Sequence, residues 1–84
     1  MDVEIIGRMQ SAKSANQMLE QIAVASHYTA KSFNNGFVVY VRHTFGLLEE
    51  ITVKQLGQRR FEIVRTVTSY PLDAIMAKEV KNIE

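Results

Sequence analysis

Basic side chains are most concentrated around one predicted turn of this chain. Arg59 and Arg60 are adjacent, and Lys54 and Arg65 lie close to them on either side. Cations grouped at the tip of a hairpin are suited to contact the phosphates of a nucleic acid. The same charges also keep a strand edge solvated and discourage pairing with other chains. The cluster is compatible with either role.

Tyr40 and Arg42 lie two residues apart in a segment of strand-like composition. We expect Phe37, Val39, Val41 and Phe45 of this segment to face the core, which leaves Tyr40 and Arg42 on the open face of a sheet. Single-stranded nucleic-acid binders stack bases on exposed aromatic rings and hold phosphates with nearby cations. This pattern predicts a candidate nucleic-acid surface made of Tyr40, Arg42, Lys54, Arg59 and Arg60.

Residues that could support catalysis are few. His27 and His43 are the only histidines, and their spacing from the nearest carboxylates, Glu49, Glu50 and Glu62, matches no metal-ligand pattern. Ser26 and His27 are neighbours, so on a helix their side chains point in different directions and form no dyad. The four glycines are isolated and open no phosphate loop. We therefore predict no catalytic, metal or cofactor site, and no enzyme.

A long uncharged stretch lies within the first predicted helix. Residues 12–33 have apolar side chains at helical spacing, with Ser11 or Ser14 as the N-cap and Asn34-Asn35-Gly36 as the end. Residues 21–30 carry no Lys, Arg, Asp or Glu, whereas a helix that packs by one face usually has charges on the other. Val24, Ala25 and Tyr28 are therefore predicted to form a second contact surface. Its partner is the last helix, a second copy of the chain or another protein.

The remaining segments predict a small α+β fold. Alternating apolar residues indicate strands over residues 3–9, 37–45, 51–56 and 60–68, and the last three form an antiparallel meander. Pro71 begins a final helix with an apolar face over residues 72–83. The expected fold is a two-layer sandwich of β-α-β-β-β-α order, with a four-stranded, mainly antiparallel sheet and both helices on one face. The place of the first strand is open. If it neighbours the strand 37–45, the helical crossover makes the two parallel.

Length and composition set the limits of function. The chain has 84 residues, which suits a single domain over 1–84, and ten Lys and Arg against nine Asp and Glu give a net charge of +1. There is no cysteine, which excludes disulfides and thiol chemistry, and no segment is apolar over the length of a membrane span. We expect a cytoplasmic protein without a membrane anchor.

Together these observations predict a small, non-enzymatic protein-interaction module. It would act as a regulator, inhibitor or assembly component, bind another protein and work as a homodimer. The alternative is a nucleic-acid-binding module that uses the basic hairpin and the open sheet face.

Overall fold

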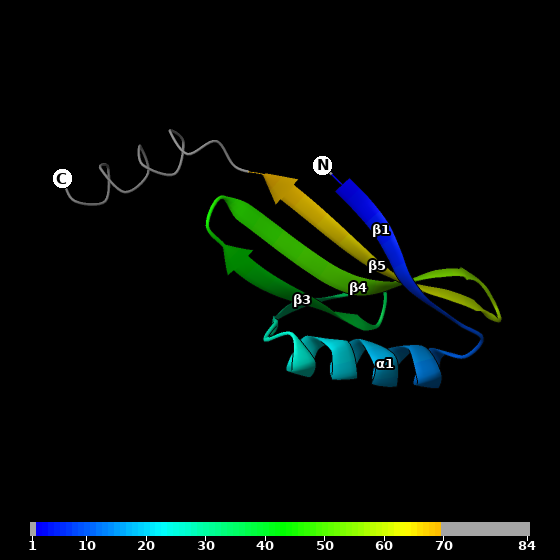
Figure 1. Ribbon diagram of the computed structural model, residues 1–84. Coiled ribbons are helices and arrows are strands. Elements are labelled where there is room, and N and C mark those ends of the chain that lie inside the picture. The colour runs from blue at the N-terminus through cyan, green and yellow to red at the C-terminus, as the bar shows by residue number, and fades with distance from the viewer. Residues whose placement is uncertain (1, 70–84) are drawn as a thin grey trace.

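A computed structural model describes residues 2–69 of the chain. Five strands and one helix occur in the order β1 (Asp2–Met9), α1 (Ala12–Ala25), β2 (Thr29–Asn34), β3 (Phe37–Thr44), β4 (Leu47–Gly57) and β5 (Arg60–Ser69). The strands form one antiparallel sheet in the spatial order β1-β5-β4-β3-β2, and α1 lies against one of its faces (Figure 1). Within residues 2–69 no helix has the length and apolarity of a membrane span.

The expected four-stranded sheet with two helices is wrong, because the segment 12–33 is not one helix. Helix α1 begins at the N-cap Ser11, whose hydroxyl accepts a hydrogen bond from the Ser14 amide at 3.1 Å. It ends after Ala25, and residues Thr29–Asn34 form the additional strand β2. The final helix expected over residues 72–83 lies outside the described residues.

The end of α1 is a Schellman motif. His27 has a φ of +60°, the left-handed conformation that closes this motif. The Tyr28 amide then donates to the Ala23 carbonyl at 2.8 Å, and the His27 amide donates to the Val24 carbonyl at 3.4 Å. The chain therefore leaves the helix well before the Asn34-Asn35-Gly36 run that we expected to end it.

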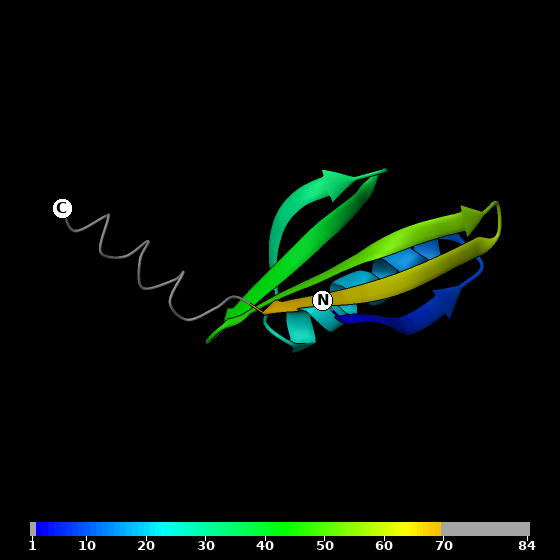
Figure 2. The ribbon, with the colours of Figure 1, turned by 90° about the horizontal axis from the view of Figure 1, so that it is seen from above.

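The Asn35-Gly36 pair instead forms the turn of the β2–β3 hairpin. Asn35 has a φ of +53° and Gly36 a φ of +84°. Two successive positive φ angles are typical of a type I′ turn, for which Asn-Gly is the favoured sequence. Toward this turn the β2–β3 hairpin diverges from β4, with which β3 pairs only over Tyr40–Thr44 (Figure 2).

The core lies between α1 and strands β4 and β5. Leu19 of the helix and Ile51 and Ile63 of the sheet have no exposed surface. Ala15 and Ala23, one helical turn before and after Leu19, are also buried, because their small side chains let the helix approach the sheet closely. Phe37 fills the space where β3 leaves β4, with its ring edge-on to Phe61 at a centroid distance of 6.1 Å.

The meander predicted from the sequence is confirmed, since β3 pairs with β4 and β4 with β5 in antiparallel register. Strand β1 does not neighbour β3. It pairs antiparallel with β5 at the far edge of the sheet, so α1 crosses from one edge strand to the other. The two edge strands each carry a bulge, between Ile5 and Gly7 in β1 and between Ala30 and Ser32 in β2.

The predicted orientation of β3 is wrong over its second half. Thr44 and Leu47 flank a two-residue turn, Phe45-Gly46, in which Gly46 has a φ of +76°. Because directly opposite residues share a face of the sheet, this register puts Tyr40 beside the buried Ile51, and Arg42 beside Glu49. Tyr40 and Arg42 therefore face the helix, whereas Val41 and His43 lie on the opposite face.

Candidate functional site

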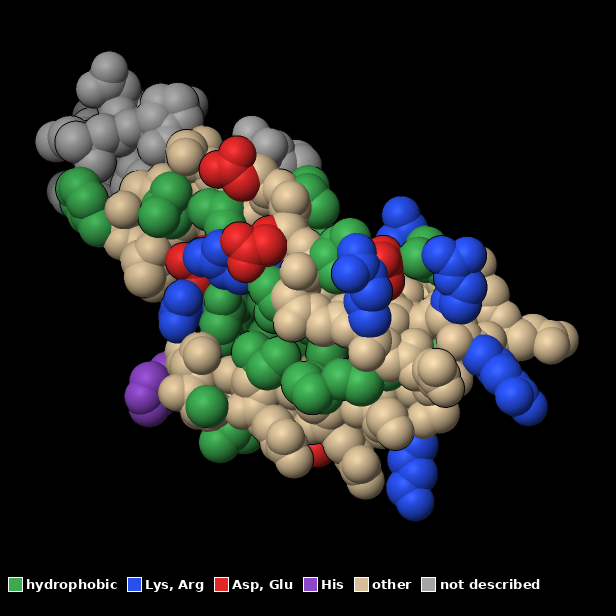
Figure 3. Space-filling model, turned by 45° about the vertical axis from the view of Figure 1, so that its right-hand side comes forward, with side chains coloured by type: hydrophobic (Ala, Val, Ile, Leu, Met, Phe, Trp, Pro, Cys, Tyr) green, Lys and Arg blue, Asp and Glu red, His purple; other side chains and the backbone are tan. Residues whose placement is uncertain are grey.

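The five residues predicted to bind nucleic acid do not form one surface. Tyr40 packs against the core under the helix, and Arg42 lies on the same face. Lys54 is directly opposite Glu62 in the ladder, which places it on the other face of the sheet. Arg59 and Arg60 are exposed at the β4–β5 turn. Figure 3 shows that most Lys and Arg side chains in this view gather toward the end of the molecule that carries this turn.

The three residues predicted to bind protein also separate. Val24 is 70% exposed and Ala25 is exposed, and both line a shallow depression on α1 together with Gln17, Glu20 and Gln21. Tyr28 is half-buried and points the other way, toward the sheet. The uncharged stretch 21–30 therefore has two explanations. In its first part Ala23 packs in the core while Val24 and Ala25 are exposed, and its second part lies beyond the end of the helix.

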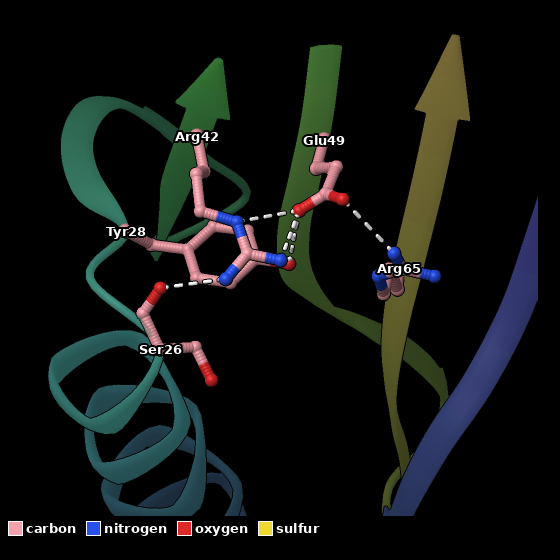
Figure 4. A network of polar contacts seen from close by, with 5 residues as sticks. All are labelled: Ser26, Tyr28, Arg42, Glu49 and Arg65. Atoms are coloured by element: carbon pink, nitrogen blue, oxygen red, sulfur yellow. Dashed lines mark hydrogen bonds and ion pairs between the residues drawn. The ribbon is translucent and has the colours of Figure 1, made fainter. Parts of the chain in front are cut away.

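Among residues 2–69 the most highly connected polar site surrounds Glu49, which is 5% exposed on the helix-facing side of β4 (Figure 4). Its Oε2 accepts hydrogen bonds from Arg42 Nε at 2.6 Å and from the Tyr28 hydroxyl at 3.1 Å, and Arg42 Nη2 forms an ion pair with the same oxygen. Its Oε1 accepts from Arg65 Nη2 at 3.1 Å. One carboxylate thus binds two guanidinium groups and a phenol.

Arg42 links this site to the end of the helix. Its Nη1 donates to the Ser26 carbonyl at 2.7 Å, and its guanidinium carbon lies 4.4 Å from the centre of the Tyr28 ring. Ser26 is the C-cap of α1, so this arginine satisfies a carbonyl at the end of the helix. The same side chain stacks on the Tyr28 ring and pairs with Glu49. The site holds the helix end, the start of β2 and the centre of the sheet together.

The electrostatics keep Glu49 ionised. Burial on its own raises the pKa of this carboxyl group, but the hydrogen bonds from Arg42 and Tyr28 and the charges of Arg42 and Arg65 lower it more. The net result is a pKa below the ordinary value of 4.5. Because both carboxylate oxygens already accept from protein donors, the chemistry of this cluster is that of a structural ion network.

Sequence reasoning missed the Glu49 network. The sequence identified Glu49 only as a carboxylate near the histidines, with a spacing that matches no metal-ligand pattern, and it predicted Arg42 on the open face of the sheet. One signal was available: a two-residue turn at Phe45-Gly46 pairs Thr44 with Leu47, and the same register then pairs Arg42 with Glu49. No group of three His, Asp or Glu side chains within residues 2–69 is placed to hold a metal ion.

Comparison with protein-family models, with curated proteins and with solved structures gives no match for this chain.

Proposed function

We propose that this protein is a non-enzymatic protein-interaction module of the cytoplasm, which acts as a regulator, an inhibitor or an assembly component. Its contact surface is the outer side of α1 around Val24 and Ala25. Binding through this surface takes one of two forms, a complex with another protein or a homodimer.

The observation that carries the proposal is the exposure of Val24. A large aliphatic side chain that is 70% exposed lies next to exposed Ala25, in a depression whose other lining residues are Gln17, Glu20 and Gln21. Only one of these five residues is charged. Interfaces are depleted in charged residues at their centre, and removing an apolar side chain such as Val24 from water favours association.

The non-enzymatic part of the proposal is supported by the state of Glu49. A general base needs a free lone pair directed at its substrate and a pKa near the working pH. Glu49 instead has both oxygens occupied and a lowered pKa. The most buried carboxylate of residues 2–69 is therefore committed to holding the fold.

The test compares the wild-type chain with Val24→Glu in affinity capture from lysate of its source, with and without nuclease. Because Val24 is exposed, glutamate at this position should change the free energy of unfolding by no more than about 0.5 kcal/mol. The matched control is Asn16→Glu, which introduces the same charge at another exposed position of α1. Light scattering coupled to gel filtration reports self-association of the same three proteins.

We expect the wild-type chain either to capture a partner protein in stoichiometric amount despite nuclease, or to form a dimer in solution. Val24→Glu should lose the partner or the dimer, and Asn16→Glu should keep it. Tyr28 is unsuitable for this test, because glutamate there would lie beside Glu49 and damage the fold. If Val24→Glu folds normally and retains the partner or the dimer at wild-type strength, the helix surface is not the interface. If nothing but nucleic acid is recovered and the protein is a monomer, the proposal as a whole is wrong.

A further inference from the structure

Charge is divided unequally between the two ends of the sheet. Around the β4–β5 turn the ladder register groups four cations with one carboxylate, namely Arg8, Lys54, Arg59 and Arg60 with Glu62. Toward the other end it groups four carboxylates with two cations, namely Asp2, Glu4, Glu49 and Glu50 with Arg42 and Arg65. A chain with a net charge of only +1 therefore presents a distinctly basic end.

The basic end contains an open pocket of about 270 Å³. Three of its lining residues are Arg8, Arg59 and Arg60, and its apolar lining comes from Met9, Leu56 and Phe61. The pocket also includes Gln10 and Glu62.

Most of the positive charge in this pocket has no carboxylate partner among residues 2–69. Arg8 Nε contacts Glu62 Oε2 at 3.4 Å, a long contact for an ion pair, and the Arg8 side chain is 75% exposed. Within residues 2–69 Arg59 and Arg60 form no ion pair, and both are exposed. Guanidinium groups bind carboxylate and phosphate oxygens through paired hydrogen bonds, so the unpaired donors define a site for an oxyanion.

We propose that this pocket binds a short acidic segment of a protein partner, with carboxylates on Arg59 and Arg60 and a neighbouring aliphatic side chain over Leu56 and Met9. This inference rests on the proposed function, because it identifies the chemistry of the partner. It adds a second contact region at the end of the sheet to the one on α1.

Three observations favour an acidic peptide over a nucleic acid or a small molecule. The only aromatic residue of the pocket, Phe61, is 4% exposed, so its ring offers no platform for a base. The volume is also slightly below the roughly 300–1,000 Å³ of common small-molecule pockets, which suits one or two side chains of a larger partner. A long polyanion that continued along the sheet would reach the acidic end with Asp2, Glu4 and Glu50.

The test measures fluorescence anisotropy with three labelled probes on the full chain. The first is a short peptide in which Glu and Leu alternate, the second is the same peptide with Gln in place of Glu, and the third is a single-stranded oligothymidylate of equal length. The variants are Arg59→Glu and Arg60→Glu, with Lys31→Glu as the control. Lys31 is an exposed cation of β2 away from the pocket, and its replacement changes the net charge by the same amount. Circular dichroism checks that each variant folds.

We expect the Glu-Leu peptide to bind more tightly than both other probes, and to lose affinity as salt rises from about 50 to 200 mM. Arg59→Glu and Arg60→Glu should each weaken it by about tenfold, and Lys31→Glu by much less. Equal binding of the Gln peptide, tighter binding of the oligothymidylate, or an equal loss in Lys31→Glu would each overturn the inference. Any of these results leaves the test of Val24 intact, so failure of the pocket and failure of the proposed function can be told apart.

Discussion

Replacement of Glu49 by glutamine removes the charge at the centre of the ion network and keeps the size of the side chain. In the native protein Glu49 accepts from Arg42, from Arg65 and from the Tyr28 hydroxyl. A glutamine has one acceptor oxygen, and its amide nitrogen would face groups that are themselves donors. At least one guanidinium group would therefore lose its partner while it is still largely buried.

The expected cost follows from the burial of the three charged groups. Removal of one partner from a fully buried ion pair destabilises a protein by about 3–5 kcal/mol. The side chain of Glu49 is 6% exposed, but those of Arg42 and Arg65 are 31% and 30% exposed and can recover some hydration. We therefore expect Glu49→Gln to lower the free energy of unfolding by about 2–3 kcal/mol, or the Tm by roughly 10–20 °C for a chain of this size.

Urea and thermal unfolding followed by circular dichroism measure this loss, with Glu50→Gln as the control. Glu50 is the next residue of β4, lies on the opposite face and forms no ion pair within residues 2–69. Its replacement should cost no more than about 0.5 kcal/mol.

The loss should also depend on pH. Because folding lowers the pKa of Glu49, the charged group stabilises the native state above its ordinary pKa of 4.5, and this contribution disappears as the pH falls through the lowered value. The difference in free energy of unfolding between wild type and Glu49→Gln should thus have its full size at pH 7 and should become smaller in acid. Equal stability of Glu49→Gln and Glu50→Gln at pH 7, or a difference that does not narrow on acidification, would refute the structural role argued for the network.

Two further changes test the elements that frame this site. His27→Gly should raise the free energy of unfolding by about 0.5–1 kcal/mol, because His27 holds a φ of +60° that glycine adopts without strain; an unchanged or lower urea midpoint would contradict the Schellman ending of α1. Leu19→Ala should lower the free energy of unfolding by about 2–5 kcal/mol, since Leu19 has no exposed surface in the core that it forms with Ile51 and Ile63. A loss below about 1 kcal/mol in urea unfolding would show that the helix does not pack on the sheet as described.

The meander was predictable because its signals are local. The β-branched and aromatic composition of residues 37–44 and the short connections at Gly46 and Gly57 identify three strands in succession. The helix ending was not predicted, since it depends on a histidine in a conformation that glycine or asparagine adopts more often. The Asn35-Gly36 pair was recognised as a terminator, although the strand-like segments on both sides also fit a hairpin turn.

The candidate sites were predicted only in part. The exposure of Arg59 and Arg60 followed from their place in a turn. Tyr40 and Arg42 were assigned to the wrong face because the apolar residues Phe37, Val39 and Val41 were expected to mark the core-facing side of the whole strand, whereas the register with β4 turns Tyr40 and Arg42 toward the helix. A shift of one residue in register moves every side chain of a strand to the other face of the sheet. Tyr28 was expected at an interface and instead donates its hydroxyl to Glu49.

The sequence by itself determined the lack of cysteine, the antiparallel meander and the basic turn at Arg59 and Arg60. These features depend on composition and on preferences that act over a few neighbouring residues. Only the tertiary structure decided that β1 pairs with β5, that Arg42 and Arg65 converge on Glu49, and that Arg8 joins the basic turn. Each of these contacts joins segments that meet only after the helix has crossed the sheet and the hairpin register is set, so no local pattern specifies them.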